Sequence, residues 1–213
     1  MAAEEEILPR LYMVSDSRRL PGGAPSLPLL VRRVVSRLRV VFQLREKHLP
    51  ALALYQLALD LRGEIGPDTS SLLSINERTD IALLCGADGV HFPEASCPLK
   101  RAMAPARDLM CGKSSHSLQS ALEAASEGVD YLFFGPVFET PSKKPFGPPK
   151  GLKELGTLCR RVSVPVYAIG GMNPERTRRC LDEGAHGIAA ISAFCSMSGL
   201  EETLDAFETV LAQ

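Results

Sequence analysis

The feature that most constrains this chain is a repeated alternation of short apolar runs with segments of helical pattern. Eight strand-type runs recur, and most are followed by a segment whose apolar residues keep a helical spacing. We expect strands at residues 11–16, 40–46, 71–76, 89–92, 108–115, 131–138, 165–171 and 187–194. Each unit then has roughly 27 residues, enough for one strand, one helix and two short loops.

Turn and cap residues place the helices between these strands. We expect helices at residues 29–38, 50–61, 79–86, 98–103, 117–128, 152–161, 173–184 and 199–211. Gly86 suits the left-handed residue that ends a helix, and Ser117 suits an N-cap. Asn173 suits another N-cap, because Pro174 after it fits the first helical position.

The expected strands are continuous apolar runs, which is typical of parallel sheets covered on both faces. Two α/β architectures fit this pattern, an open doubly wound sheet and a closed TIM (β/α)₈ barrel. Eight units without a break in composition favour the barrel. We therefore predict a single TIM-barrel domain over residues 1–213.

Composition narrows the class of partner and the compartment. With a net charge of −1, the chain lacks the excess of positive charge that is typical of proteins that bind nucleic acid or an anionic membrane surface. The start MAAEEEILPR lacks the pattern of a signal peptide, and no apolar run approaches the roughly 18 residues that span a bilayer. The six cysteines form no CxxC pair and show no zinc spacing. We expect a cytoplasmic protein that binds neither nucleic acid nor membrane.

Polar residues gather where the strands end, and a barrel carries its active site there. Gln43, Arg45 and Lys47 alternate, so on a strand their side chains would point the same way, either to a ligand or as a solvated edge. Glu46 would point the opposite way. The basic residues expected to meet on this face are Arg45, Lys47, Lys113, Lys143 and Lys144. The sequence therefore predicts a pocket for a small anion.

The last two strand ends suggest a phosphate site. Gly170 and Gly171 let backbone N–H groups approach a phosphate, and the helix after them points its positive end there. Ile191 and Ser192 end the neighbouring strand and complete the usual phosphate position of this architecture. The alternative is a tight turn without a ligand.

Two histidines lie in informative positions. His91 stands inside an apolar run and is expected to be a core residue with satisfied hydrogen bonds. His116 follows the fifth strand in a polar loop, so we take it as the candidate acid or base.

Four segments carry a family resemblance that runs in order from about Leu11 to Phe194. They are QLREK, SINERTDIALLCGADGVH, SSHSLQSALEAASEGVDYLFFGPVFETPSKK and PVYAIGGMNPERTRRCLDEGAHGIAAIS. These segments resemble the thiamine phosphate synthase family and its TenI-type relatives. The resemblance implies a TIM barrel that acts on small phosphorylated thiazole or pyrimidine ligands, without an organic cofactor, and it also suggests a homodimer.

The resemblance also implies roles for particular residues. Synthases join a pyrimidine diphosphate to a thiazole phosphate with loss of pyrophosphate. The residues that would hold the pyrimidine diphosphate are Gln43, Arg45, Lys47 and Asn76. Those that would surround the pyrimidine, the pyrophosphate and the thiazole are Ser114, Thr140, Ser142 and Lys143. Gly170, Gly171, Ile191 and Ser192 would take the thiazole phosphate, and the catalytic set would be Arg45, Lys47, His116 and Lys143.

The chain departs from the family pattern at the metal site. Synthases usually carry Asn-Asp after strand three and Gly-Gln-x-Asp after strand four, and these two aspartates bind Mg²⁺. Here Glu77 and Ser96 stand at those positions, and a serine is a poor substitute for a carboxylate. Glu77 is left as the candidate Mg²⁺ ligand, with Glu94 able to compensate from two positions away.

A second departure concerns the TenI branch, which isomerises thiazole carboxylate phosphate to its aromatic tautomer. The expected form has a histidine where this chain has Pro136, so His116 would have to serve. The leading hypothesis is a TenI-like member that binds thiazole phosphate or thiamine phosphate. The alternatives are an active synthase, a non-catalytic thiamine phosphate-binding or regulatory protein, and an unrelated phosphosugar isomerase on the same fold.

Overall fold

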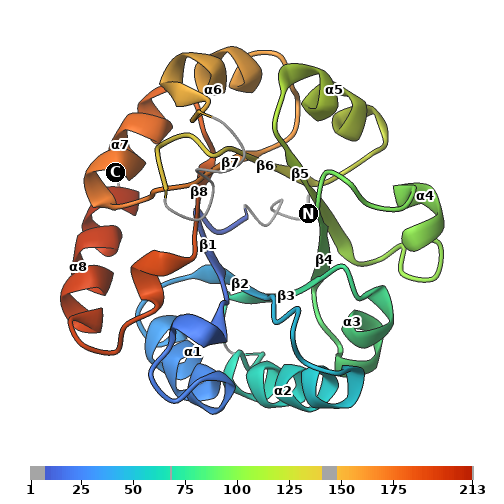
Figure 1. Ribbon diagram of the computed structural model, residues 1–213, viewed down its shortest axis with the longest axis vertical. Coiled ribbons are helices and arrows are strands. Elements are labelled where there is room, and N and C mark those ends of the chain that lie inside the picture. The colour runs from blue at the N-terminus through green and yellow to red at the C-terminus, as the bar shows by residue number, and fades with distance from the viewer. Residues whose placement is uncertain (1–7, 68, 141–147, 213) are drawn as a thin grey trace, which may run out of the picture.

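The fold is a closed barrel of eight parallel strands (Figure 1). The computed structural model describes residues 8–67, 69–140 and 148–212. Strands pair in sequence order, and β8 closes onto β1 with Leu11 opposite Ile188. The strands are β1 Leu11–Val14, β2 Val40–Leu44, β3 Leu72–Asn76, β4 Gly89–Phe92, β5 Met110–Ser115, β6 Tyr131–Phe134, β7 Val166–Ile169 and β8 Gly187–Ala190. The predicted TIM barrel is confirmed, and the open sheet is excluded.

Helices follow the strands and surround the barrel (Figure 1). They are α1 Leu27–Val35, α2 Ala51–Glu64, α3 Thr79–Cys85, α4 Leu99–Ala102, α5 Leu118–Ser126, α6 Gly151–Cys159, α7 Pro174–Asp182 and α8 Leu200–Leu211. Gly86 ends α3 in the left-handed conformation, and Ser117 and Asn173 accept N-cap hydrogen bonds, as predicted. None of the described helices is both long and apolar enough to span a bilayer.

Several strands are shorter than the sequence predicts, for local reasons. β6 ends at Phe134, because Pro136 has no amide hydrogen to continue the ladder. β7 ends at Ile169, because Gly170 turns the chain with φ of 103°. β2 ends at Leu44, so Arg45 and Lys47 lie in the loop after the strand.

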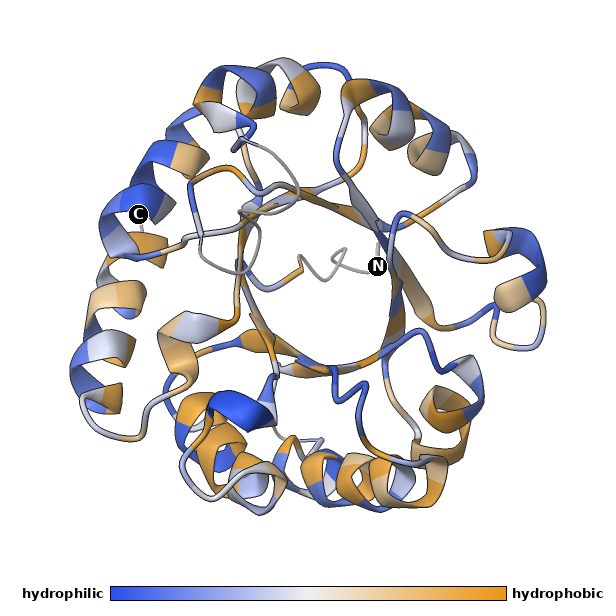
Figure 2. Cartoon of the chain, viewed as in Figure 1, coloured by the Kyte–Doolittle hydropathy of each residue, from blue (hydrophilic) through white to orange (hydrophobic). Residues whose placement is uncertain are grey.

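Apolar side chains fill two separate layers. The larger core lies between the strands and the helices, and the smaller one fills the barrel interior. In Figure 2 the strands are mostly hydrophobic, whereas the helices alternate hydrophobic and hydrophilic stretches. This pattern fits helices that bury one face against the barrel.

The barrel interior holds a hydrogen-bonded group of polar rings. The hydroxyls of Tyr12 and Tyr131 lie 2.6 Å apart, and the Tyr131 hydroxyl lies 3.1 Å from Nδ1 of His91. Nε2 of His91 lies 2.9 Å from Oγ of Ser114, near the carboxyl end of β5. His91 is buried, and its ring centroid is 4.0 Å from that of Phe133. The prediction of a core histidine is confirmed.

Gly112 is required beside this group. A Cβ atom on Gly112 would lie 1.9 Å from Cζ of Tyr131, closer than real Cβ contacts allow. Tyr131 cannot easily move away, because it is buried and hydrogen-bonded on both sides.

We expect Gly112→Ala to destabilise the protein by about 1–3 kcal/mol or more, the usual cost of overpacking. The matched control is Gly63→Ala in α2, where an added Cβ meets no atom within 4 Å. That change should instead stabilise the helix by about 0.5–1 kcal/mol. Urea unfolding of both variants measures the difference, and equal stabilities would contradict the expected clash.

A second expectation concerns acid stability. Burial, together with the charge of Arg45, lowers the pKa of His91 to about 3, whereas an unfolded histidine titrates near about 6.5. Between these pH values the unfolded chain binds a proton that the folded chain does not. The contribution of His91 to stability is therefore lost as pH falls from about 6.5 toward 3, by at most about 1.4 kcal/mol per pH unit.

His91→Gln keeps hydrogen-bonding groups at this position but does not titrate. We expect the free energy of unfolding of wild type to fall more steeply than that of His91→Gln between about pH 7 and pH 4. Urea unfolding at several pH values gives the two slopes. Parallel slopes would show that His91 is not held neutral in the folded protein.

Candidate active site

The end of β2 and the end of β3 form one hydrogen-bonded network. Nε2 of Gln43 donates to Oδ1 of Asn76 at 3.0 Å, and Nδ2 of Asn76 donates to Glu77 at 2.9 Å. Nζ of Lys47 lies 2.9 Å from the same Glu77 carboxylate. Oε1 of Gln43 is buried without a hydrogen-bond partner among the described residues. An unpaired buried oxygen at a strand end is a place where a ligand donor would fit.

The loop after β2 is fixed to the loop after β1. The backbone N–H of Arg45 donates to Oγ of Ser15 at 2.8 Å. Glu46 points the opposite way, as predicted, and accepts hydrogen bonds from the backbone N–H and the hydroxyl of Ser17. These bonds leave the half-buried Arg45 side chain on the site face. In the described part of the chain, no carboxylate lies within 4.0 Å of its guanidinium.

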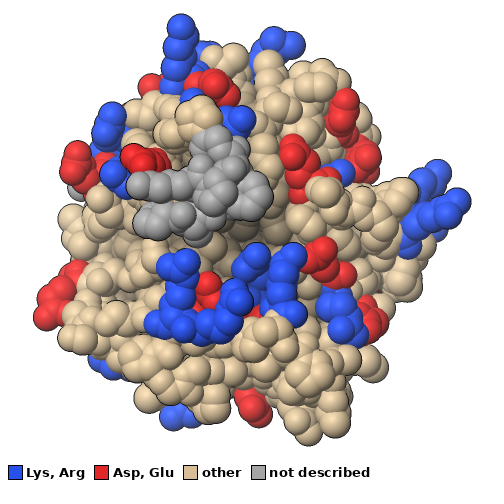
Figure 3. Space-filling view, in the orientation of Figure 1, with Lys and Arg blue, Asp and Glu red and all other residues tan. Residues whose placement is uncertain are grey.

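Basic side chains gather on this face more than the sequence pattern indicates (Figure 3). Arg18 and Arg19 follow β1 in the short helix η1, Ser17–Arg19, and both pair with Asp16. Sequence reasoning missed both arginines, because they follow the strand by a turn rather than alternate on it. Arg78 follows β3 and pairs with Asp80.

The prediction that Lys113 belongs to this basic face is wrong. Gly112 and Ser114 face the barrel interior, so Lys113 between them faces the helices. There its Nζ lies 3.0 Å from a carboxylate oxygen of Glu127, just after α5. The predicted ligands Ser142 and Lys143, and the basic residue Lys144, lie outside the described residues.

The predicted phosphate loop packs tightly against the loop after β6. A Cβ on Gly170 would lie 2.6 Å from Pro136, and one on Gly171 would lie 2.8 Å from the carbonyl of Glu139. Both glycines also have positive φ, 103° and 67°. Arg176 in the first turn of α7 donates to the carbonyl of Gly171 at 2.6 Å. The glycines are therefore needed for packing and turn geometry, whether or not a phosphate binds.

The end of β8 lies near the loop after β1. Ile191 is half-buried and Ser192 is exposed at the start of the short helix η4, Ser192–Phe194. Burial raises the pKa of Cys195, and the positive charge of Arg19 opposes that rise. The charges of Asp16 and Glu46 act in the opposite sense to that of Arg19, which is paired with Asp16.

His116 is held in a defined orientation. Its Nδ1 lies 2.5 Å from the carbonyl oxygen of Gly135, and its backbone N–H donates to Oε1 of Glu94 at 2.9 Å. Because a carbonyl only accepts, Nδ1 carries the proton and Nε2 carries the lone pair of the neutral ring. Pro136 follows Gly135 directly, and Thr140 lies four residues further along this loop. The structure thus places His116 beside the position where the sequence lacks a histidine.

The residues present do not fit the Mg²⁺ site of the family pattern. Burial opposes ionisation of Glu77, but Lys47, Asn76 and Arg45 together hold its pKa below the usual range. Glu94 is already bonded to the backbone of His116, and Oγ of Ser96 donates to the next carbonyl. The described residues contain no group of three His, Cys, Asp or Glu side chains that could hold a metal ion.

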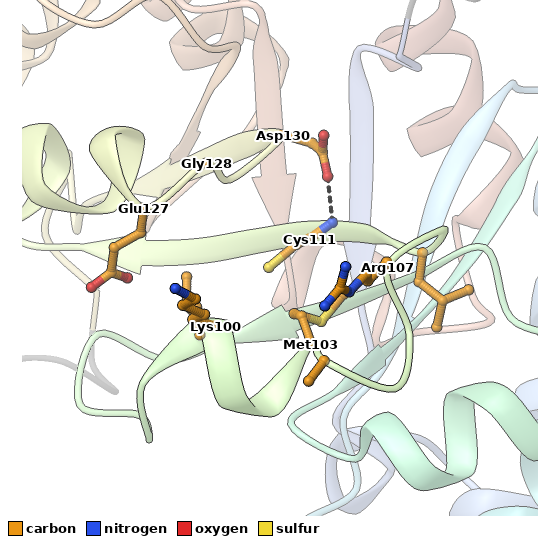
Figure 4. A pocket seen from close by; sticks show the side chains of 10 residues that line it. Lys100, Met103, Arg107, Cys111, Glu127, Gly128 and Asp130 are labelled. Atoms are coloured by element: carbon orange, nitrogen blue, oxygen red, sulfur yellow. Dashed lines mark hydrogen bonds between the residues drawn. The ribbon is translucent and has the colours of Figure 1, made fainter.

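A cavity of about 400 Å³ lies elsewhere, between α4 and α5 (Figure 4). It is lined by Leu99, Lys100, Met103, Ala104, Arg107, Leu109, Cys111, Glu127, Gly128 and Asp130. Cys111 lies at the amino end of β5, Asp130 directly precedes β6, and the backbone N–H of Cys111 donates to the Asp130 carboxylate. The cavity is therefore at the opposite end of the strands from the candidate site, beside the single turn of α4.

Comparisons with known proteins identify the family of the chain. A family model described as thiamine monophosphate synthase matches residues 11–194. The chain is 42% identical to "Putative thiamine-phosphate synthase 2" of Aquifex aeolicus, over 88% of this chain and 98% of that protein. It is 37% identical to the thiamine-phosphate synthase of Methanocella arvoryzae, over 95% of both chains. A solved thiamine phosphate pyrophosphorylase from Pyrococcus furiosus superposes with a TM-score of 0.82 at 29% identity, covering 97% of this chain and 96% of that one. The chain therefore belongs to the thiamine monophosphate synthase family.

Proposed function

We propose that this protein is a TenI-like member of the family, which binds thiazole phosphate or thiamine phosphate and acts as a thiazole tautomerase. The proposal rests mainly on one observation: the two acidic side chains nearest to the family's Mg²⁺ site are both already bonded to other groups of the protein. Glu77 is paired with Lys47, and Glu94 is bonded to the backbone of His116. A reaction that releases pyrophosphate needs concentrated positive charge, and this chain offers a poor set of metal ligands for it.

The phosphate end of the ligand would lie at Gly170, Gly171, Ile191 and Ser192. Backbone N–H groups there and the start of α7 favour an anion. Arg176 fixes the Gly171 carbonyl and also lies 4.9 Å above the ring of Phe138. This arrangement supports binding of a monophosphate without a metal ion.

His116 would move the proton in the tautomerase reaction. The bond from Nδ1 to Gly135 leaves Nε2 as the basic atom, able to take a proton from a ring carbon of the thiazole and return it at another position. No other hydrogen bond to this ring is formed within the described residues. His116 would thus replace the histidine that the TenI pattern has at Pro136.

The tautomerase can be tested directly with thiazole carboxylate phosphate. We expect His116→Ala to lower the rate about 10²-fold or more, because general acid–base catalysis contributes at least that much. Gln119→Ala, an exposed change in the first turn of α5, should keep the wild-type rate. Conversion followed by NMR of the substrate gives both rates, and an undiminished rate in His116→Ala would exclude its role as the base.

An active synthase is the second candidate, and the network at the end of β2 favours it. Gln43 has an unpaired buried oxygen, and Arg45 has no carboxylate within 4.0 Å among the described residues. Both are residues that the family resemblance assigns to the pyrimidine diphosphate. Mixing both precursors with Mg²⁺ decides between the candidates. Robust thiamine phosphate formation that is lost in Arg45→Ala and in Lys143→Ala would establish the synthase and overturn the TenI-like proposal.

Metal affinity provides a further test that does not depend on turnover. We expect wild type to bind Mn²⁺, a spectroscopic substitute for Mg²⁺, more weakly than the double variant Glu77→Asp/Ser96→Asp, which restores both family carboxylates. Electron paramagnetic resonance of free Mn²⁺ measures both affinities. Equal and tight binding by wild type would mean that Glu77 leaves Lys47 to hold the metal.

Thiamine phosphate binding without either reaction would instead support the non-catalytic alternative.

A further inference from the structure

We propose that His91 is a positioning residue, which fixes the hydroxyl of Ser114 as a hydrogen-bond donor toward the ligand. The proposal rests on the proposed function only in that the ligand supplies the acceptor. Its basis is the chain of hydrogen bonds that runs through the barrel from Tyr12 through Tyr131 and His91 to Ser114.

The chain has a preferred direction. If Tyr12 donates to Tyr131 and Tyr131 donates to Nδ1 of His91, then the proton on Nε2 is donated to Ser114. Each donor from Tyr12 to His91 then has an acceptor within the chain of hydrogen bonds, and the hydrogen of Ser114 is left to point out of it. Ser114 is half-buried at the carboxyl end of β5, whereas Tyr12 is fully buried.

The reverse direction leaves a donor unsatisfied. In that order Ser114 donates to His91, and the last hydrogen belongs to the Tyr12 hydroxyl. Among the described residues, Tyr131 is the hydrogen-bond partner of that hydroxyl. Ser74 lies near both tyrosines, but its buried Oγ has no partner at hydrogen-bond distance. A buried hydroxyl without an acceptor costs about 1–3 kcal/mol, so the first direction is favoured.

The environment of His91 keeps the imidazole neutral. It is buried among Tyr12, Tyr131 and Phe133, and Arg45 adds positive charge from the end of β2. A neutral imidazole has one donor and one acceptor nitrogen, so it can pass on the direction set by the tyrosines. An imidazolium would donate on both sides and erase that direction.

The consequence for recognition is a preference for acceptors at this point of the site. A hydroxyl held as a donor suits an unprotonated ring nitrogen or a phosphate oxygen of the ligand. A ligand that presents an N–H or O–H there would meet a second donor and would bind less well.

The tautomer can be measured in the ligand-free protein. In protein labelled with ¹⁵N-histidine, the chemical shift of each ring nitrogen shows whether it carries a proton. We expect the proton of His91 on Nε2, with Nδ1 unprotonated, at neutral pH. His91→Gln identifies the signals by their loss, and Ser114→Ala identifies them by a shift if the first variant does not fold. A proton on Nδ1, or on both nitrogens, would overturn the proposal.

A double-mutant cycle tests whether His91 acts through Ser114. Titration calorimetry with thiamine phosphate should show about tenfold weaker binding for Ser114→Ala, the worth of one hydrogen bond, and a similar loss for His91→Gln. The double variant should bind no more weakly than Ser114→Ala, because a positioning residue has no effect once its target is removed. Losses that multiply would indicate a merely structural role for His91 and contradict the proposal.

The matched control is Ser74→Ala, the same change at another buried hydroxyl of the barrel interior. It should leave both the His91 tautomer and the affinity unchanged. A tautomer shift in Ser74→Ala would show that Ser74 ends the chain as an acceptor and would overturn the stated direction. If wild type does not bind thiamine phosphate, the proposed function fails, and the ligand-free tautomer still decides the proposal for His91.

Discussion

The barrel closes around polar rings that must satisfy their own hydrogen bonds, and much of the structure depends on this constraint. Tyr12, Tyr131 and His91 fill space that aliphatic residues occupy in many barrels of this type, and water cannot reach them. Each hydroxyl and ring nitrogen therefore needs a partner at a fixed distance. The adjacent strand must then be free of a side chain at Gly112, and the chain of hydrogen bonds can end only at the open end of the barrel, at Ser114.

Tight packing also determines the geometry of the candidate site. The loop after β6 is bonded to the end of β7, since the backbone of Val137 donates to Ile169 and that of Phe138 donates to Gly170. These two hydrogen bonds bring Pro136 against Gly170. They also hold the Gly135 carbonyl in the position where it accepts a hydrogen bond from His116. The orientation of the candidate base and the shape of the phosphate loop are therefore set by one packed junction, which links β5, β6 and β7.

The barrel could be predicted from the sequence because its signals are local and repeated. Apolar runs, the caps at Ser117 and Asn173 and the glycine at Gly86 each act within a few residues. Lys113 was misplaced because the direction of a side chain depends on strand register, and a shift of one residue turns it to the other face. Arg19 was missed because it follows β1 in a turn and does not alternate with other polar residues on the strand. The roles of the site residues stay predictions, because a ligand's position leaves no local pattern.

Glu77 stands where the family pattern has a Mg²⁺-binding aspartate, but its carboxylate pairs with Lys47. Its φ of 62° is unusual for a residue other than glycine and costs about 1–2 kcal/mol. The ion pair with Lys47 is exposed, so it is worth at most about 1 kcal/mol and does not offset that cost. The backbone bond from Glu77 to the carbonyl of His91, at 3.0 Å, and the following turn hold this conformation instead. The turn after β3 thus fixes the position of the carboxylate, and Lys47 and Asn76 together orient it.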